Sequence, residues 1–217
     1  MHIEHEIKGT GLGRKRGTMA GTAAETRFES KRDSILKAAA TCFNEKGYSG
    51  TSLKDVARHL GLTDAALYYY VRNKEELVYQ CYLRAADLGR QAMERGVEEG
   101  GNGFEQAFLY LRYHIGVMVG DDGPVAIMSE IPSLNRIHRN EILEVSRRHS
   151  TGFEAILDRG IADGSVAPCD VRMTGNAIMG SINWIPKWYH GKAKMAERIL
   201  AEFPVILTRG LRPDPGR

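Results

Sequence analysis

Apolar positions along the chain follow the spacing of successive amphipathic helices. In the first such segment they recur at Ile35, Ala38, Ala39, Cys42 and Phe43. Intervals of three, four, seven and eight residues place these side chains on one helix face. Gly47 is expected to end this helix, because glycine accepts the left-handed backbone that closes many helices. No sustained alternation of apolar and polar residues suggests a strand, so the fold is predicted to be all-α.

Two short helices are expected next. Ser52 is a natural N-cap, and Asp55 three residues later completes an arrangement like a capping box. The apolar stripe of this helix, before Gly61, is Leu53, Val56, Ala57 and Leu60. Thr63 can cap the second short helix, predicted from Asp64 to about Val71.

Longer helices fill the rest of the pattern. Asn73 and Glu76 form another predicted capping box, which opens a fourth helix that runs to about Gly96. A fifth is expected from Phe104 to about Val119, where the sequence GDDGP breaks the pattern.

Ser133 is predicted to cap a further helix with a basic polar side. Its expected inward positions are Ile137, Ile142, Val145, Phe153, Ile156 and Leu157. Its polar side carries Arg136, Arg139, Arg147 and Arg148. Such a set is either a solvated face or a contact for an anionic ligand.

The last informative stretch is NAIMGSINWIPKWYHGK, residues 176–192. Asp170 can cap its helix, which Pro186 should kink or break. Trp184 and Trp188 are four residues apart and therefore share a face. They are either core or dimer-interface aromatics, or the lining of a ligand channel.

Residues 1–26 mix glycine, threonine and charge without periodicity, and we interpret them as a flexible arm. Its basic run, Arg14 to Arg16, has two interpretations. Either it is a solvated cluster upstream of a true start near Met19, or it touches DNA phosphates.

Two short helices joined by a tight GLT turn are typical of a helix-turn-helix. If Leu67 and Val71 face inward, the start of the second helix and its tyrosines project outward. Small residues there allow close approach to base edges, and tyrosine offers a ring and a phosphate-binding hydroxyl. Lys74, at the positive end of the fourth helix, adds a phosphate contact.

The segment GTSLKDVARHLGLTDAALYYYVRNKEEL, residues 50–77, resembles the DNA-binding signature of the TetR (tetracycline-repressor) family. That signature has a TT or TS start, a G-[VL]-[ST] turn and the ending LYxHF-xx-KEEL. This chain departs from it at two positions, with Tyr70 for the usual histidine and Val71 for the usual phenylalanine. Operator preference is therefore not carried over.

The resemblance implies a homodimeric repressor that binds double-stranded operator DNA. Residues 27–73 would form the three-helix DNA-binding domain, and residues 74–217 the helical ligand-binding and dimerisation domain. The phosphate contacts fall on Thr51, Ser52, Tyr68, Tyr70 and Lys74, the base-facing positions on Asp64, Ala65 and Tyr69, and Thr63 completes the DNA-binding set. Other interpretations stay open: Tyr68 could pack on the first helix, Asp64 could serve only the helix dipole, and Lys74 could be a plain surface charge.

A shorter resemblance concerns the inducer. The string INWIPKWY is similar to an NW-xx-WY segment in TetR regulators that respond to acyl-CoA thioesters. It implies that Trp184 and Trp188 line a ligand channel, and that arginines, Arg147 among them, hold the CoA phosphates. A hydrophobic drug or another metabolite is the alternative inducer.

Composition narrows the remaining classes. The net charge of +3 permits an anionic partner but does not demand one. The three scattered cysteines, Cys42, Cys81 and Cys169, indicate neither disulfides nor a zinc site. Because no signal-peptide core or apolar run of about 20 residues is found, we expect a cytoplasmic protein without a membrane partner.

Catalytic motifs are missing from the sequence. It holds no HExxH, GxSxG or P-loop, and its seven histidines share no helical register. We therefore predict a protein that is not an enzyme and has neither metal nor cofactor. The alternative from another class is a helical interaction protein that retains the helix-turn-helix without operator specificity.

Overall fold

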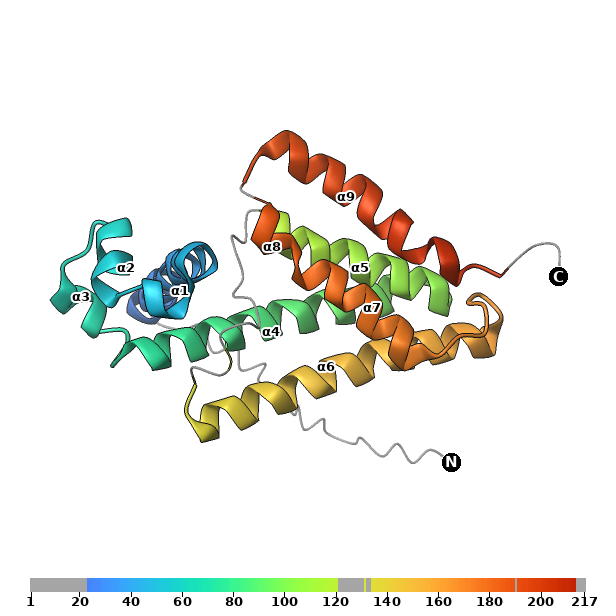
Figure 1. The fold of residues 1–217 in the computed structure, drawn as a ribbon, viewed down its shortest axis with the longest axis horizontal. Helices are drawn as coiled ribbons and strands as arrows, with labels where there is room; N and C mark the ends of the chain where they lie inside the picture. Colours follow the sequence, from blue (N-terminus) through green and yellow to red (C-terminus); the bar gives the residue numbers. More distant parts are fainter. Residues whose placement is uncertain (1–22, 121–130, 132–133, 190, 214–217) are drawn as a thin grey trace, which may run out of the picture.

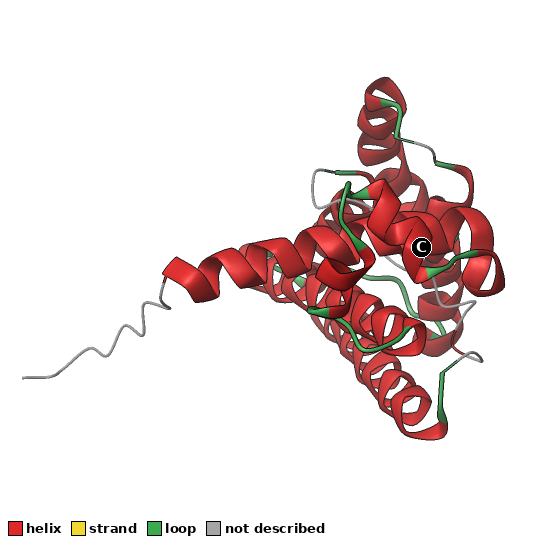
Figure 2. Ribbon diagram, turned by 90° about the vertical axis from the view of Figure 1, so that its left-hand side faces the viewer, coloured by secondary structure: helices red, strands yellow, loops and turns green. Residues whose placement is uncertain are grey.

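The computed structural model describes residues 23–120, 131, 134–189 and 191–213. Within these ranges the regular elements are helices, and Figure 2 shows no strand among them. The α-helices are α1 (Ala23–Gly50), α2 (Leu53–His59), α3 (Asp64–Tyr68), α4 (Lys74–Glu99), α5 (Gly103–Val119), α6 (Arg136–Asp163), α7 (Val171–Asn183), α8 (Ile185–Trp188) and α9 (Ala193–Thr208), followed by the 3-10 helix η2 (Arg209–Leu211). The all-α prediction is confirmed.

Helix α4 connects the two parts of the molecule. In Figure 1 it extends from the group α1–α3 into the group formed by α5, α7, α8 and α9, and α6 runs alongside it. A first apolar core joins α1–α3 to the start of α4, around Phe43, Leu67 and Leu77. A second core lies further along, around Tyr110 and Phe153. Both cores therefore contain side chains of α4 or pack against it.

Helix α1 begins before the predicted boundary. Residues 23–26 are helical, so the prediction of a flexible arm is wrong for these four. Residues 1–22, with the basic run Arg14 to Arg16, lie outside the described residues. At Gly47 the backbone leaves helical geometry, with φ 70° and ψ 173°. The first helical run therefore breaks at the predicted residue, and α1 continues beyond this kink to Gly50.

Most of the predicted caps are found. The Ser52 hydroxyl accepts from the Asp55 amide at 3.1 Å, and the Asp55 carboxylate accepts from the Ser52 amide at 2.9 Å. Thr63, Asn73 and Asp170 each accept from the backbone three residues on. The second capping box differs from the prediction, because Glu76 accepts from the Arg72 amide and not from Asn73.

The start of α6 corrects two predictions. Its N-cap is Asn135, which accepts from the Ile137 and His138 amides, so the helix begins after the predicted cap. Ser133 itself lies outside the described residues. Ile137 is 74% exposed, not inward-facing, because the first turn of α6 precedes the point where the helix meets the core.

The C-terminal segment contains a predicted break and an unpredicted helix. α7 ends at Asn183 and α8 begins at Ile185, with Pro186 in its first turn, where proline lacks only a hydrogen bond that is absent anyway. α9 was not expected from the sequence. Among the described residues, no helix is long and apolar enough to cross a membrane.

Candidate DNA-binding surface and ligand cavity

Helix α3 presents the side chains that a recognition helix needs. Leu67 and Val71 are buried, which anchors the segment. Tyr69 is 73% exposed and Tyr68 56%, so neither ring is taken up by the core. Asp64 and Ala65, in the first turn, are also exposed. The outward positions expected from the motif are thus free to meet a partner.

Tyr69 and Tyr70 pack against Phe28 of α1, a contact that sequence reasoning missed. Tyr70 stacks on Phe28 with ring centroids 5.0 Å apart. Tyr69 meets Phe28 edge-on at 5.8 Å and Tyr70 at 5.2 Å. These contacts hold the Tyr69 ring in one orientation on the exposed side of α3.

The remaining residues of the predicted interface differ in accessibility. Thr51 is buried, and its hydroxyl donates towards the carbonyls of Cys42 and Gly47, so it fastens the end of α1 and has no path to a phosphate. Ser52 and Thr63 are exposed and cap their helices. Lys74 is half-buried at the start of α4, with its Nζ 4.0 Å from the centre of the Tyr48 ring.

Helices α4 to α8 line a cavity of about 360 Å³ in the C-terminal part. Its lining comes from α4 (Tyr82, Ala85, Ala86, Gly89), α5 (His114, Met118), α6 (Ile142, Val145, Ser146, His149, Ser150), α7 (Asn176, Met179, Gly180, Asn183) and Pro186 of α8. Most of this surface is apolar, and no arginine, lysine, aspartate or glutamate of the described chain is among the lining residues. The cavity thus suits an uncharged, largely apolar molecule.

His114 and His149 form part of the polar lining of the cavity, beside Ser146, Ser150, Asn176 and Asn183. His114 is 6% exposed, and His149 lies next to it with ring centroids 5.6 Å apart. The Tyr110 hydroxyl is 2.7 Å from Nε2 of His149. Burial lowers the pKa of His114 to about 3, with a smaller contribution from His149, and burial also lowers the pKa of His149. Both imidazoles are therefore neutral near neutral pH.

The predicted ligand contacts lie outside this cavity. Arg147 is exposed and pairs with Glu144 at 2.7 Å, one residue from the lining residue Ser146. Trp184 is 61% exposed at the break between α7 and α8. Trp188 packs on Phe203 of α9, with ring centroids 5.7 Å apart. The two tryptophans do not lie on one continuous helix, because Trp184 is the residue between α7 and α8, and neither lines the cavity.

A second, wider cleft adjoins the cavity. It has a volume of about 950 Å³ and lies between α1, the end of α5 and α8–α9. Met118 and Pro186 belong to both linings, so the two spaces adjoin at these side chains. Glu45 and Lys187 bring opposite charges to the cleft, and it therefore lacks the one-sided charge of an anion site.

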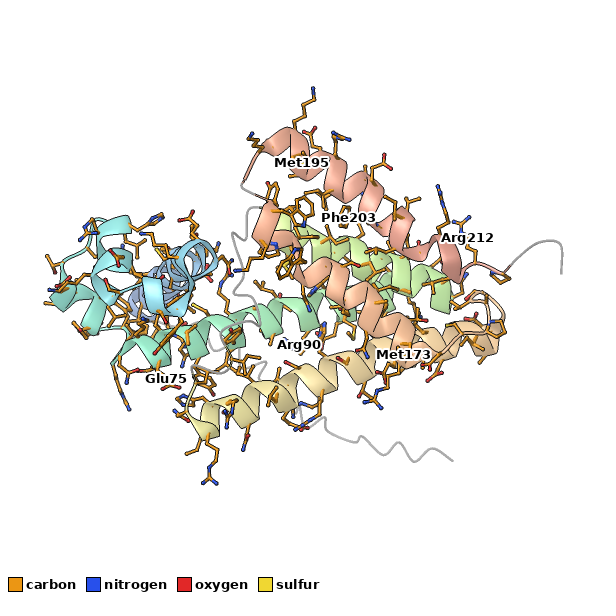
Figure 3. The ribbon with its side chains drawn as sticks, in the orientation of Figure 1. Glu75, Arg90, Met173, Met195, Phe203 and Arg212 are labelled. Atoms are coloured by element: carbon orange, nitrogen blue, oxygen red, sulfur yellow. The ribbon has the colours of Figure 1, made fainter. Side chains whose placement is uncertain are left out.

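A polar cluster joins the starts of α4 and α6, close to the recognition helix. Glu75 lies 2.7 Å from Nδ1 of His138 and accepts from both amides of Asn135. His138 also stacks on Tyr79, with ring centroids 3.9 Å apart. Burial raises the pKa of Glu75, but these hydrogen bonds more than offset it and hold the pKa below its usual value. Figure 3 shows Glu75 at the end of α4 that faces α6.

The helix-turn-helix, joined to a further helical domain, defines a helix-turn-helix transcription regulator, and the cavity is its candidate ligand site. Residues 35–81 match the family model "Bacterial regulatory proteins, tetR family", and residues 100–211 match "Tetracyclin repressor-like, C-terminal domain". The chain belongs to the TetR family of transcriptional regulators.

Individual relatives agree with this assignment. The crystal structure of PfmR, a TetR regulator from Thermus thermophilus, is 32% identical, with a TM-score of 0.70 over 82% of this chain and 99% of that one. A fatty acid metabolism regulator protein of Bacillus subtilis is 25% identical over 69% of this chain and 78% of its own length. The repressor KstR2 of Mycolicibacterium smegmatis is 25% identical over 86% and 93%. AibR, solved with isovaleryl coenzyme A and operator DNA, shares the fold at 23% identity, with a TM-score of 0.68 over 81% and 97%.

Sequence reasoning missed the residues that shape the cavity, above all His114 and His149. A signal was present in one of them, since His114 lies three residues after Leu111 and beside Ile115, on the apolar stripe of α5. A histidine in such a stripe faces the interior. Its place beside a cavity became visible only from the packing of α4, α6 and α7.

Proposed function

We propose that this chain is a dimeric repressor that binds a palindromic operator and leaves it when an apolar small molecule enters the cavity. The observation that carries the proposal is the double role of α4. Its first turn follows the recognition helix directly, and its middle, from Tyr82 to Gly89, lines the cavity. A ligand that shifts α4 therefore also shifts the DNA-binding helices.

The proposed DNA interface consists of exposed residues around α3. Asp64, Ala65 and Tyr69 would face base edges in the major groove, and Tyr68 would reach the backbone. The other phosphate contacts would be Ser52, Tyr70 and Lys74, with Thr63 at the helix start. The buried Thr51 contributes through the backbone geometry at the end of α1.

Dimerisation is proposed through α7 and α9. These helices leave large apolar side chains exposed, among them Met173, Val205 and Ile206. Exposed apolar side chains on neighbouring elements are typical of a partner surface. A twofold dimer would present two recognition helices to half-sites about 34 to 36 Å apart, or somewhat more.

An acyl-CoA thioester is the proposed inducer. The cavity lies near the lower end of the usual range for ligand sites, about 300 to 1,000 Å³, so it suits an acyl group rather than a whole CoA thioester. The nucleotide would remain outside, where Arg147 borders the lining residue Ser146 and could exchange Glu144 for a phosphate. Trp184 and Trp188 would then flank the external part of the ligand. In support, one relative is named a fatty acid metabolism regulator protein, and AibR, which shares the fold, was solved with isovaleryl coenzyme A.

The test is a footprint on DNA upstream of the protein's own gene. The proposal predicts two protected half-sites related by a dyad, in a complex with two protein chains. A single half-site occupied by one chain would contradict the dimer. Failure to select any DNA sequence over random competitor would favour the helical interaction protein without operator specificity.

A further inference from the structure

We propose that His114 is the polar anchor of the cavity, and that the part of the inducer inside the cavity is apolar except for an uncharged carbonyl group at this point. This inference rests on the proposed function, since it specifies the chemistry of the inducer. It names a contact that neither the DNA-binding motif nor the two tryptophans suggest.

His114 is a buried polar group with unused hydrogen-bonding capacity. Neither Nδ1 nor Nε2 has a hydrogen-bond partner among the described residues, although the side chain is only 6% exposed. Buried polar groups are normally hydrogen-bonded, so each exception calls for a reason. The ring borders the cavity, which makes a molecule in the cavity the natural partner for its nitrogens.

The neighbouring groups aim the ring at this space. The backbone of α4 comes close at Gly89, where an added Cβ would lie 3.0 Å from Cε1 of His149 and 3.1 Å from Cε1 of His114. A glycine here lets both imidazoles approach α4, and it lines the cavity itself. His149 is already committed to the Tyr110 hydroxyl at 2.7 Å. His114 is therefore the less occupied of the two rings.

The charge state of the wall selects the chemical class of the ligand. A neutral imidazole offers one N–H donor and one acceptor. A carbonyl oxygen satisfies the donor without bringing charge into the cavity. A carboxylate would enter a space whose described lining has no arginine or lysine to pair with it, and an unpaired buried charge is strongly unfavourable. Esters, thioesters and amides therefore fit better than free acids.

The experiment measures binding of octanamide, methyl octanoate and octanoate to the full-length protein by calorimetry at neutral pH. We expect the amide and the ester to bind. Octanoate should bind about tenfold more weakly than they do, or not at all. In protein with ¹⁵N-labelled histidine, the amide should shift the ring-nitrogen resonances of His114. Octanoate binding as tightly as the amide would overturn the proposal, as would failure of both neutral probes to bind.

Variants separate an anchor from a structural histidine. His114→Leu should weaken octanamide binding about tenfold without lowering the melting temperature of the free protein, because it removes a polar group that has no protein partner. His114→Gln, which keeps a donor and an acceptor, should recover part of the affinity. His59→Leu, the same exchange at an exposed position of α2 outside the cavity, is the control and should bind octanamide like the wild type.

Unchanged octanamide affinity in His114→Leu would overturn the anchor. A large loss of melting temperature in the same variant would also overturn it, since His114 would then be a structural residue. These binding experiments do not involve operator DNA. If they contradict the anchor, the proposed repressor function is unaffected, because the footprinting experiment tests it separately.

Discussion

The Glu75 carboxylate lies 2.7 Å from the His138 imidazole and so ties the first turn of α4 to the first turn of α6. Both side chains are about three-quarters shielded from solvent. Further along, α4 and α6 both line the cavity, through residues such as Ala86 and Val145. A ligand that moves these two helices apart would strain the contact between Glu75 and His138, which lies close to the recognition helix. The pair is thus placed to pass ligand binding on to the DNA-binding domain.

His138→Phe should weaken the link between ligand and DNA while leaving each binding event largely intact. Phenylalanine keeps the stacking on Tyr79 but cannot bond to Glu75. We expect the coupling free energy to fall by about 0.5 to 2 kcal/mol. The measurement is operator affinity with and without saturating ligand. A coupling free energy equal to that of the wild type would show that this contact does not transmit ligand binding to the DNA-binding domain.

Lys74→Ala should weaken binding to all DNA sequences equally. A phosphate contact releases counterions but reads no base, so the slope of log K against log salt should fall by about one unit. Lys194→Ala, on the exposed start of α9, is the control and should leave the slope unchanged. If the two variants behave alike, Lys74 is a plain surface charge held over Tyr48.

Tyr69→Ala should change which operator variants are preferred, by about 1 to 3 kcal/mol, if the ring meets a base. Tyr69→Phe keeps the ring contacts with Phe28 and Tyr70 and removes only the hydroxyl. Comparing the two variants on a set of operator variants shows whether ring or hydroxyl carries the preference. A uniform loss of affinity over all operator sequences would instead indicate that Tyr69 contacts the DNA phosphate backbone.

The burial of His114 makes stability depend on pH. Its pKa is lowered to about 3 in the folded protein, against about 6.5 for a free histidine. Between these values the unfolded chain binds the extra proton, so the stability is fully present above about pH 6.5 and is lost as the pH falls towards 3. His114→Leu should flatten this part of the curve of unfolding free energy against pH. A wild-type slope in the variant would assign the effect to other groups.

The sequence predicted what short-range patterns determine. Ser52 and Thr63 are read as caps because the groups they bind lie three residues away. The inward side of α3 followed from Leu67 and Val71, four residues apart. These local signals were enough to place the recognition helix and its exposed tyrosines.

Contacts between distant residues could not be read in the same way. Glu75 and His138 are 63 positions apart, and nothing in either local pattern pairs them. Ile137 matched a helical stripe, but the stripe does not say where α6 meets the core. The apolar pattern of each helix likewise does not predict a cavity, because its lining comes from five helices. Its histidine wall depends on the close approach of α4 at Gly89.

The most direct test of the proposed mechanism is a titration of a preformed protein–operator complex with CoA thioesters of varied acyl length, beside the matching free acids. Release requires a ligand that prefers the DNA-incompetent form, since equal affinity for both forms shifts nothing. We predict that at least one thioester weakens operator binding by about 5- to 150-fold, corresponding to about 1 to 3 kcal/mol of coupling, and that its free acid does far less. No release by any thioester, together with release by an uncharged hydrophobic compound that lacks a carbonyl group, would contradict both the acyl-CoA assignment and the carbonyl anchor.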